Sequence, residues 1–527
     1  MHFGTHEQLI LVALLVGLAA LLVAAPAFRI PYPIFLVLGG LALGFVPGMP
    51  TLALPPDVVL VAVLPPLLYL SAYRTSLRDL RANTRAIGIL AIGLVVATTV
   101  TVGVVAHAAV DSMSWSAAFV LGAVVAPTDP IAATAIMRRL GVPRRLVSIV
   151  ESESLVNDGT ALVLYRVAVV AAISGAFSVW DASWRFVWAV VGGIAIGIVV
   201  GFVTAEVRRR LDNPPVEVTI ALMTGYLAFI PANAASASGV LAVVTAGVFL
   251  GWRTPELTSV QTRLQGEAVW SILAFVLNAL VFALVGLQLS SILDTLTGLS
   301  DGELIRYGLL VTGTVIATRI LWLPVFTHLP RLLPGVTRPV KPFAHTFLIS
   351  WAGMRGAVSL AAALAIPLRT DAGAAFPERD LIIFLTFCVI LGTLVLQGLS
   401  LPGLIRMTRI EPDHTEDEED ARARIRAAEA AIARLDELLG EEWVREDTAE
   451  RLRGLYGFRV NRFSSRFDEN ADGAIEEQSQ SYQRLRRELL DAERAAVTQL
   501  GRDGEISGDV VTRVRRDLDL EDARLDI

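Results

Sequence analysis

Residues 151–160 form a polar string, ESESLVNDGT, at the start of an otherwise apolar stretch. On a helix, Ser154 and Asp158 are i,i+4 neighbours on one face, and Glu153 and Asn157 form a parallel pair about 100° away. A carboxylate beside a hydroxyl and an amide can hold either a dehydrated cation or a proton, but not both at once. This competition is the chemistry of an exchanger. The alternative is a buried polar cluster that only stabilises helix packing.

A second polar group, Ala126-Pro-Thr-Asp-Pro130, lies within an apolar run. Its two prolines each remove a backbone donor and interrupt a helix. Interrupted helices at membrane depth occur where they are buried in protein or line a cavity, and their freed carbonyls can coordinate a cation. Thr128 and Asp129 are therefore candidate ligands. Asp129 could also simply cap the second half-helix, because Asp is a favoured N-cap residue.

Three arginines, Arg319, Arg355 and Arg166, lie well inside predicted spans, away from the span ends. An arginine stays charged, so within a helix bundle it needs an anionic partner. Glu153 is the natural partner of Arg319, and that pairing would leave Asp158 free to titrate. Arg355 stands among small residues in WAGMRGAVS, a pattern that allows a second helix break. Arg166, two turns beyond Asp158, faces an outer vestibule or extends to the membrane interface.

The composition indicates a polytopic membrane protein. Hydrophobic residues make up 54% of the 527 positions, and mean hydropathy is +0.59. An ionisable side chain at the bilayer centre costs about 2.5–3.5 kcal/mol on insertion scales, so the buried acids must face the bundle interior or a cavity. Apolar runs of spanning length predict about thirteen transmembrane helices, near 7–27, 31–48, 56–73, 84–110, 115–137, 147–175, 184–206, 215–233, 238–252, 267–292, 304–328, 344–368 and 380–404.

Positive charges in the loops predict the orientation. With an outside N-terminus, the cytoplasmic loops hold nineteen Lys and Arg residues and the opposite loops hold four. The C-terminal region would then be cytoplasmic. The sequence after Arg409 is acidic and then helical in period, so we expect a transmembrane domain over 1–410 and a helical cytoplasmic domain over 411–527.

The positions of the two breaks predict an inverted repeat. The fifth span of the first six and the fifth of the last six are both interrupted, which is typical of transporters built from inverted repeats. We expect repeats at about 7–175 and 215–404, with broken helices that cross beside Asp158. Cys388 is the single cysteine, so the sequence offers no disulfide or thiolate metal site.

Three segments resemble the sodium/proton exchangers of the cation:proton antiporter-1 family: APTDPIAATAI, ESESLVNDGTALVLY and SWAGMRGAVSLAAALAIP. The resemblance implies a secondary antiporter, not an enzyme, that exchanges Na⁺ or Li⁺ for H⁺ by elevator-type alternating access. It further implies a homodimer in the plasma membrane. The implied partners are a monovalent cation, a proton and the lipid bilayer, with no cofactor and no nucleic acid.

The resemblance also assigns site residues. Asp158 would bind the cation and the proton, with Asn157 beside it, and the Asn-Asp pair resembles electroneutral members. The implied Na⁺ ligands are Asp158, Asp129, Thr128 and Ser154. Glu153 and Arg319 would form a structural ion pair, and Arg355 would lie in the second broken helix.

The chain departs from the family pattern in one place. Several relatives carry an acid shortly after a Leu-Pro-Pro motif in the third span, and Leu70 occupies that position here. K⁺/H⁺ exchange therefore remains an alternative, and a cation channel is another. An intramembrane hydrolase would need a Ser–His pair at depth or an HExxH motif, and the sequence offers neither.

Overall fold

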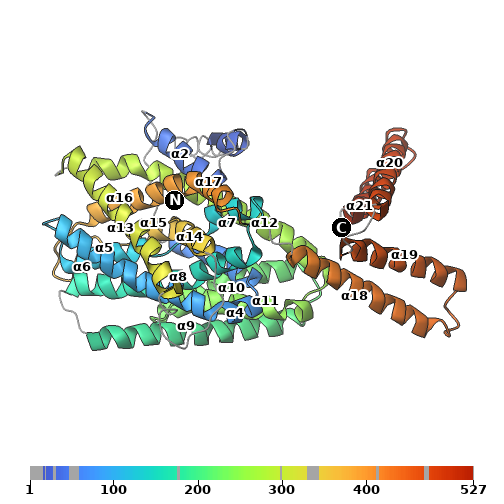
Figure 1. The fold of residues 1–527 in the computed structure, drawn as a ribbon, viewed down its shortest axis with the longest axis horizontal. Coiled ribbons are helices and arrows are strands. Elements are labelled where there is room, and N and C mark those ends of the chain that lie inside the picture. Colours follow the sequence, from blue (N-terminus) through green and yellow to red (C-terminus); the bar gives the residue numbers. More distant parts are fainter. Residues whose placement is uncertain are drawn as a thin grey trace. The chain divides into compact units, whose positions relative to one another are not determined.

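The structure is a computed structural model that describes residues 16–17, 19–25, 27, 31–46, 58–174, 179–296, 299–328, 343–410, 415–467 and 474–525. Within these residues the regular structure is helical, apart from one isolated bridge between Arg369 and Ala375. The all-α fold class is therefore confirmed. The chain divides into two compact units, Met1–Pro412 and Asp413–Ile527 (Figure 1).

The helices of the first unit follow the predicted spans closely. The first half contains α2 (Tyr32–Gly44), η1 with α3 (Val58–Val63, Leu64–Arg74), α4, η2 and α5 (Leu77–Gly88, Ile89–Leu94, Val95–Ala109), α6 (Trp115–Val125), α7 (Ile131–Arg139) and α8 (Arg144–Ser174). After α9 (Val179–Arg208), the second half contains α10 (Pro214–Ala234), α11 (Gly239–Leu257), α12 (Val260–Thr295), α13 (Asp301–His328), α14 (Phe343–Trp351), α15 (Ala357–Leu364) and α16, η4 and α17 (Arg379–Gly392, Thr393–Gln397, Gly398–Thr408).

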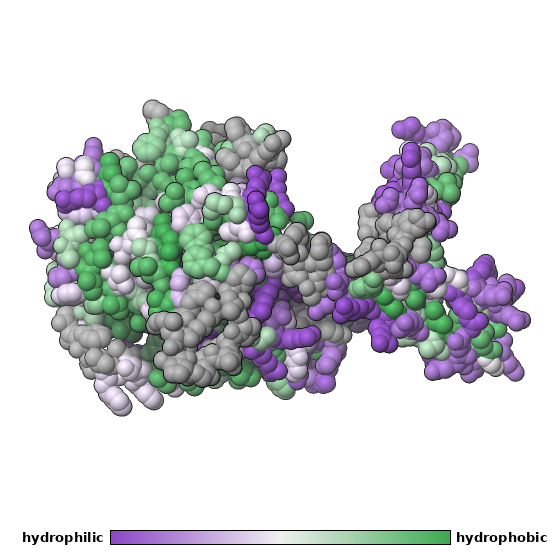
Figure 2. All heavy atoms as spheres, in the orientation of Figure 1, coloured by the Kyte–Doolittle hydropathy of each residue, from purple (hydrophilic) through white to green (hydrophobic). Residues whose placement is uncertain are grey.

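The first unit has the length and surface of a membrane domain. Seven helices among the described residues are long and apolar enough to cross a bilayer, and three shorter apolar helices accompany them. The described residues of this unit are largely hydrophobic on the face shown in Figure 2. The exact number of thirteen spans stays a prediction, because residues 7–15 of the first span lie outside the described residues, as do four residues of the orientation count: Arg29, Arg331, Arg338 and Lys341.

Both predicted interruptions are present. The chain leaves helical geometry after Val125 and resumes it at Ile131, and it does so again between Trp351 and Ala357. The first break contains two prolines, which cannot donate backbone hydrogen bonds. At the second, a β-carbon on Gly356 would overlap the Asp129 carboxylate. Glycine is therefore required where the two breaks meet.

Two hydrophobic clusters organise the first unit. One draws mainly on α5–α8, α13 and α16, and the other on α3, α10 and α11. We call them the core cluster and the scaffold cluster. The polar string lies on α8, whose Leu155 belongs to the scaffold cluster and whose Val150 belongs to the core cluster. Helix α8 therefore stands at the boundary between the two.

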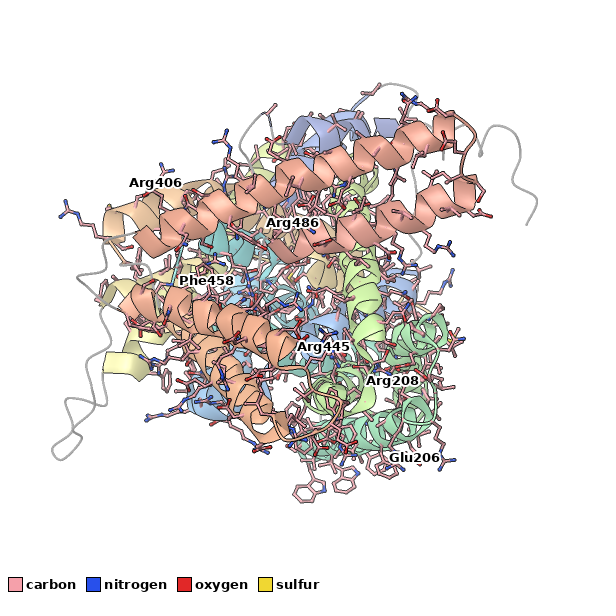
Figure 3. All side chains as sticks on the ribbon, turned by 90° about the vertical axis from the view of Figure 1, so that its right-hand side faces the viewer. Glu206, Arg208, Arg406, Arg445, Phe458 and Arg486 are labelled. Atoms are coloured by element: carbon pink, nitrogen blue, oxygen red, sulfur yellow. The ribbon has the colours of Figure 1, made fainter. Side chains whose placement is uncertain are left out.

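The second unit consists of helix pairs. Helix α18 (Thr415–Leu438) packs against α19 (Glu446–Ser464), which is followed by η5 (Ser465–Phe467), and α20 (Ala474–Arg502) packs against α21 (Gly508–Leu525) (Figure 3). Ion pairs join the second hairpin: Arg494 contacts Asp522 at 2.8 Å and Asp519 at 3.0 Å. The helical character matches the sequence, and the cytoplasmic location stays a prediction.

Candidate functional site

Helix α8 carries the polar string into the middle of the first unit. Asp158 is 5% exposed, and Glu153 and Asn157 are each 1% exposed. The helical spacing puts Ser154 one turn before Asp158, and both line the same cavity. Burial of this many polar groups is costly unless each finds a partner. Thr128 in the first break is the partner of Ser154 and Asn157, and Arg319 is the partner of Glu153.

The first break is held by side chains of α8. Asn157 donates from Nδ2 to the Thr128 hydroxyl at 2.7 Å, and the Ser154 hydroxyl donates to the Thr128 carbonyl at 2.7 Å. Within the described residues, Asn157 Oδ1 is buried and has no hydrogen-bond partner. These contacts leave oxygen lone pairs of Ser154, Thr128 and Asn157 close together. A small alkali cation prefers such a set of hard oxygen ligands.

Asp129 joins the two breaks. Its Oδ1 accepts a hydrogen bond from the Ile131 N–H at 2.9 Å, and its carboxylate also accepts from the backbone of Ala357. Its own N–H donates to the Met354 carbonyl at 2.8 Å. The carboxylate therefore caps the first turns of both α7 and α15. Asp129 therefore both caps the two helices and lies near Asp158 on the cavity wall.

Arg319 lies against Glu153. The guanidinium contacts both carboxylate oxygens, from Nη1 to Oε1 and from Nη2 to Oε2 at 2.8 Å, and each side chain is 1% exposed. Arg319 also donates from Nε to the Ser350 carbonyl and from Nη2 to the Ile349 carbonyl, both at 3.0 Å. The arginine thus neutralises an acid and covers the C-terminal end of α14.

Arg355 covers the matching end of the other broken helix. It is fully buried, and its Nη1 donates to the Ala126 carbonyl at the end of α6. Its backbone N–H donates to the Thr393 hydroxyl at 3.0 Å. Within the described residues, Arg355 Nε and Nη2 have no partner. The sequence placed Arg355 in the second break and did not indicate that it reaches across to the first.

A cavity of about 690 Å³ opens onto these groups. Its wall on the core side carries Asp158, Asp129, Thr128 and Ser154, and Leu70 faces it from α3. Further polar residues line this cavity, among them Ser71, Arg74, Arg138, Glu151, Glu267 and Asn278. The two arginines of this lining, Arg74 and Arg138, belong to loops that the sequence predicts to be cytoplasmic.

Two polar residues of this lining were not predicted from the sequence. Asn278 and Glu267 both lie on α12 and both reach the cavity. Asn278 is the single polar residue in the apolar string FVLNALVF. An isolated polar residue within a predicted span indicates a position that faces the bundle interior or a cavity. Glu267 lies near the exposed start of a predicted span and gave no comparable signal. Neither entered the predicted ligand set.

Arg166 connects α8 to the scaffold on the far side of Asp158. Its Nη1 donates to the Ala237 carbonyl at 3.0 Å, and its Nη2 donates to Asn233 Oδ1 at 2.6 Å. Both acceptors belong to the end of α10 and the turn that follows. Arg166 therefore makes a contact between helices, which neither expectation from the sequence had included.

An all-helical membrane unit with two broken helices that cross beside buried carboxylates defines the class of ion-coupled membrane transporters. A family model described as "Sodium/hydrogen exchanger, transmembrane" matches residues 10–406. The chain belongs to the sodium/hydrogen exchanger family, as its three segments predicted. It is thus a multi-pass membrane protein of the cation/proton exchange class, and its family consists of transporters rather than enzymes.

Relatives and a solved structure agree with this assignment. The chain is 38% identical to an uncharacterised Na⁺/H⁺ exchanger of Mycobacterium tuberculosis over 98% of this chain and 96% of the relative. It is 33% identical to the sodium, potassium, lithium and rubidium/H⁺ antiporter of Bacillus subtilis, over 71% and 58%. The sodium proton antiporter MjNhaP1 of Methanocaldococcus jannaschii shares its fold, with a TM-score of 0.61 at 19% identity, over 75% of this chain and 97% of that one.

The buried ion pair predicts a large difference between two neighbouring glutamates. Removing the charge in Glu153→Gln leaves Arg319 uncompensated and should destabilise the fold by about 3–5 kcal/mol. Glu151→Gln is the matched control, because Glu151 pairs with Arg138 at 2.8 Å near the surface and should lose at most about 1 kcal/mol. Thermal unfolding of the purified variants in detergent measures both. Equal midpoints would contradict the structural role of the buried pair.

Proposed function

We propose that this protein exchanges Na⁺ or Li⁺ for H⁺, with the two ions competing for Asp158. One observation carries the proposal. Among the described residues, Glu153 is neutralised by Arg319 and Asp129 caps two helices, whereas Asp158 receives no hydrogen bond or ion pair from the protein. Asp158 also faces the cavity. It is the buried carboxylate left to bind cargo.

The surrounding oxygens support a cation site. Ser154, Thr128 and the unpaired Asn157 Oδ1 stand beside Asp158, and Asp129 shares the cavity wall. A cation bound here would be neutralised by the single free carboxylate, and so would a proton. One charge would move in each direction per cycle, which supports electroneutral exchange. The ion gradient supplies the free energy, so we propose no cofactor.

Elevator-type alternating access is the proposed mechanism. The proposed ligands lie on α8 and on the first break, and α6–α8 pack mainly in the core cluster. The scaffold cluster on α3, α10 and α11 forms the opposite side. Movement of the core past the scaffold would carry the site from one face to the other. We propose a homodimer formed through the scaffold, following the family resemblance.

The proposed location is the plasma membrane, with the N-terminus outside and the C-terminal unit in the cytoplasm. The support is the concentration of arginines on one side of the predicted topology. In this orientation the cavity would open toward the cytoplasm, because Arg74 and Arg138 of its lining belong to loops predicted to be cytoplasmic. The structure would then correspond to an inward-open state.

K⁺/H⁺ exchange is the second candidate. Leu70 presents an apolar wall to the cavity where several relatives carry an acid, and fewer charged ligands relax the demand for a small ion. The Bacillus subtilis relative is named for sodium, potassium, lithium and rubidium. Comparing Na⁺, Li⁺ and K⁺ in one vesicle assay separates the candidates. A cation channel would instead pass current under a membrane potential without moving protons.

Asp158→Asn should abolish exchange. The amide can neither release a proton nor neutralise a cation, so everted vesicles with an imposed pH gradient should show no dequenching of a pH dye when Na⁺ is added. Asp380→Asn is the matched control, because Asp380 pairs at 3.5 Å with Arg379 and does not line the cavity. Exchange that persists in Asp158→Asn at the wild-type rate would rule out the proposed site.

Arg166→Gln should weaken cation binding from the cytoplasmic side. The variant loses two charge-assisted hydrogen bonds that hold α8 to the turn after α10 in the inward-open state, each worth about 1.5–3 kcal/mol. A smaller inward-open population raises the apparent dissociation constant in proportion. We expect the half-maximal Na⁺ concentration in everted vesicles to rise about tenfold or more.

The partner residue supplies the control for this contact. Asn233→Ala removes one acceptor of the same guanidinium, so it should shift the half-maximal concentration in the same direction. The double variant should add less than the sum of the two effects. Fully additive effects would show that Arg166 acts without Asn233.

A further inference from the structure

A second hollow of about 460 Å³ lies where α3, α4 and the end of α11 meet. It shares only Arg74 and Thr75 with the cavity that holds Asp158. Its volume falls within the range of small-ligand sites. Because the connection between α3 and α4 forms its wall, the hollow borders both the scaffold cluster and the helices that lead into the core cluster.

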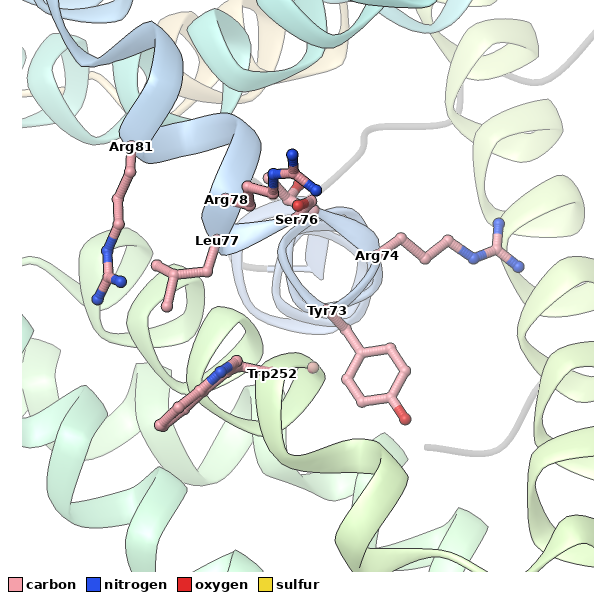
Figure 4. Close-up of a pocket in the computed structure, with 9 residues that line it drawn as sticks. Tyr73, Arg74, Ser76, Leu77, Arg78, Arg81 and Trp252 are labelled. Carbon is pink, nitrogen blue, oxygen red and sulfur yellow. The ribbon is translucent and has the colours of Figure 1, made fainter. Parts of the chain in front are cut away.

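The hollow is strongly basic. Three arginines line it, and no acid does. Arg78 and Arg81 are three residues apart on α4, and their side chains leave the helix in different directions, with Leu77 between them (Figure 4). Within the described part of the chain, neither has an ion-pair or hydrogen-bond partner. Arg74 points away toward α12, where it donates to Ser271 at 3.3 Å (Figure 4). Two guanidinium groups are therefore left for an anion.

The helix that carries these arginines adds to the positive field. Helix α4 begins after Ser76, whose hydroxyl accepts from the Asp79 N–H at 3.3 Å. Its N-terminal end thus borders the hollow and contributes partial positive charge. Asp79 is the acid in the first turn, and it does not line the hollow. The net field inside remains positive and suits a phosphate group.

The other wall points to a membrane ligand. Trp252 lines the hollow near the end of α11 and is 60% exposed. Arg253 lies over the Phe249 ring at 5.1 Å and the Trp252 ring at 5.8 Å. Exposed tryptophan beside arginine at the end of an apolar helix is typical of the headgroup level of a bilayer. A soluble anion would make no favourable contact with this exposed apolar wall.

We propose that this hollow binds the headgroup of an anionic phospholipid, with its phosphate on Arg78 and Arg81 and its chains along Trp252. Basic pockets between transmembrane helices on the cytoplasmic side suit such headgroups. Binding itself does not rest on the proposed function. A consequence for transport does, because a lipid held at the α3–α4 connection would link the scaffold to the moving core.

Native mass spectrometry of the full-length protein in detergent tests the site. The wild type should bind phosphatidylglycerol saturably and more tightly than phosphatidylcholine. Each basic residue near an anionic lipid surface contributes about fivefold in affinity, so Arg78→Gln/Arg81→Gln should weaken phosphatidylglycerol binding about 25-fold. The double Arg→Lys variant should retain most of the binding, which separates loss of charge from misfolding.

Arg209→Gln is the matched control, because Arg209 is an exposed arginine paired with Glu206 at 2.9 Å and lies outside the hollow. It should bind phosphatidylglycerol like the wild type. Equal binding by the double Gln variant, or an equal loss in the control, would overturn the site. Competition by inorganic phosphate at the same concentrations as the lipid would overturn the assignment to lipid and indicate a soluble anion.

Proteoliposomes then test the consequence for transport. Exchange by the wild type should differ between phosphatidylcholine and phosphatidylcholine–phosphatidylglycerol vesicles, and exchange by the double Gln variant should not. Equal dependence in both proteins would overturn the regulatory role. Absence of exchange by the wild type in every vesicle would refute the proposed function alone, because the binding measurement needs no transport.

Discussion

Four helix ends meet at the two interruptions, and side chains of opposite sign neutralise them where lipid and protein offer little screening. Arg355 and Arg319 cover the carbonyl ends of α6 and α14, and Asp129 accepts from the amide ends of α7 and α15. Unsatisfied backbone groups at this depth would each cost several kcal/mol. The crossing of the broken helices depends on these contacts, and the rest of the site is arranged around it.

This neutralisation decides which acid is available for chemistry. Three carboxylates lie close to one another: Glu153 and Asp158 are buried, and Asp129 is half-buried. Glu153 forms a bidentate ion pair with Arg319, and Asp129 accepts hydrogen bonds from the ends of two helices. Both carboxylates therefore already have partners within the protein. Asp158 has neither kind of partner and faces the cavity. A site that releases one ion and binds another needs a carboxylate without a partner in the protein. A carboxylate that is already paired would have to break that pair in every cycle.

The sequence predicted the features that depend on residues close together along the chain. The prolines and glycines indicated both breaks, and helical spacing put Ser154 and Asp158 on one face of α8. Contacts made by long side chains were harder to foresee. That Arg355 reaches the carbonyl of Ala126 depends on how two distant segments cross, and no spacing encodes it. The acceptors of Arg166 are likewise set by the packing of α8 against the turn after α10.

The cavity is asymmetric, and this asymmetry bears on movement and selectivity together. Its oxygen-rich wall lies on α8 and the first break, whereas α3 contributes Leu70 to the facing wall. In the proposed elevator mechanism, a cation held only from the core side would travel with that side as a rigid body, without exchanging ligands on the way. An acid at position 70 would add a ligand on α3, in the scaffold cluster, which would have to be released whenever the core moved. Leu70 removes that attachment, and it also removes a negative charge that would favour a small, strongly hydrated ion.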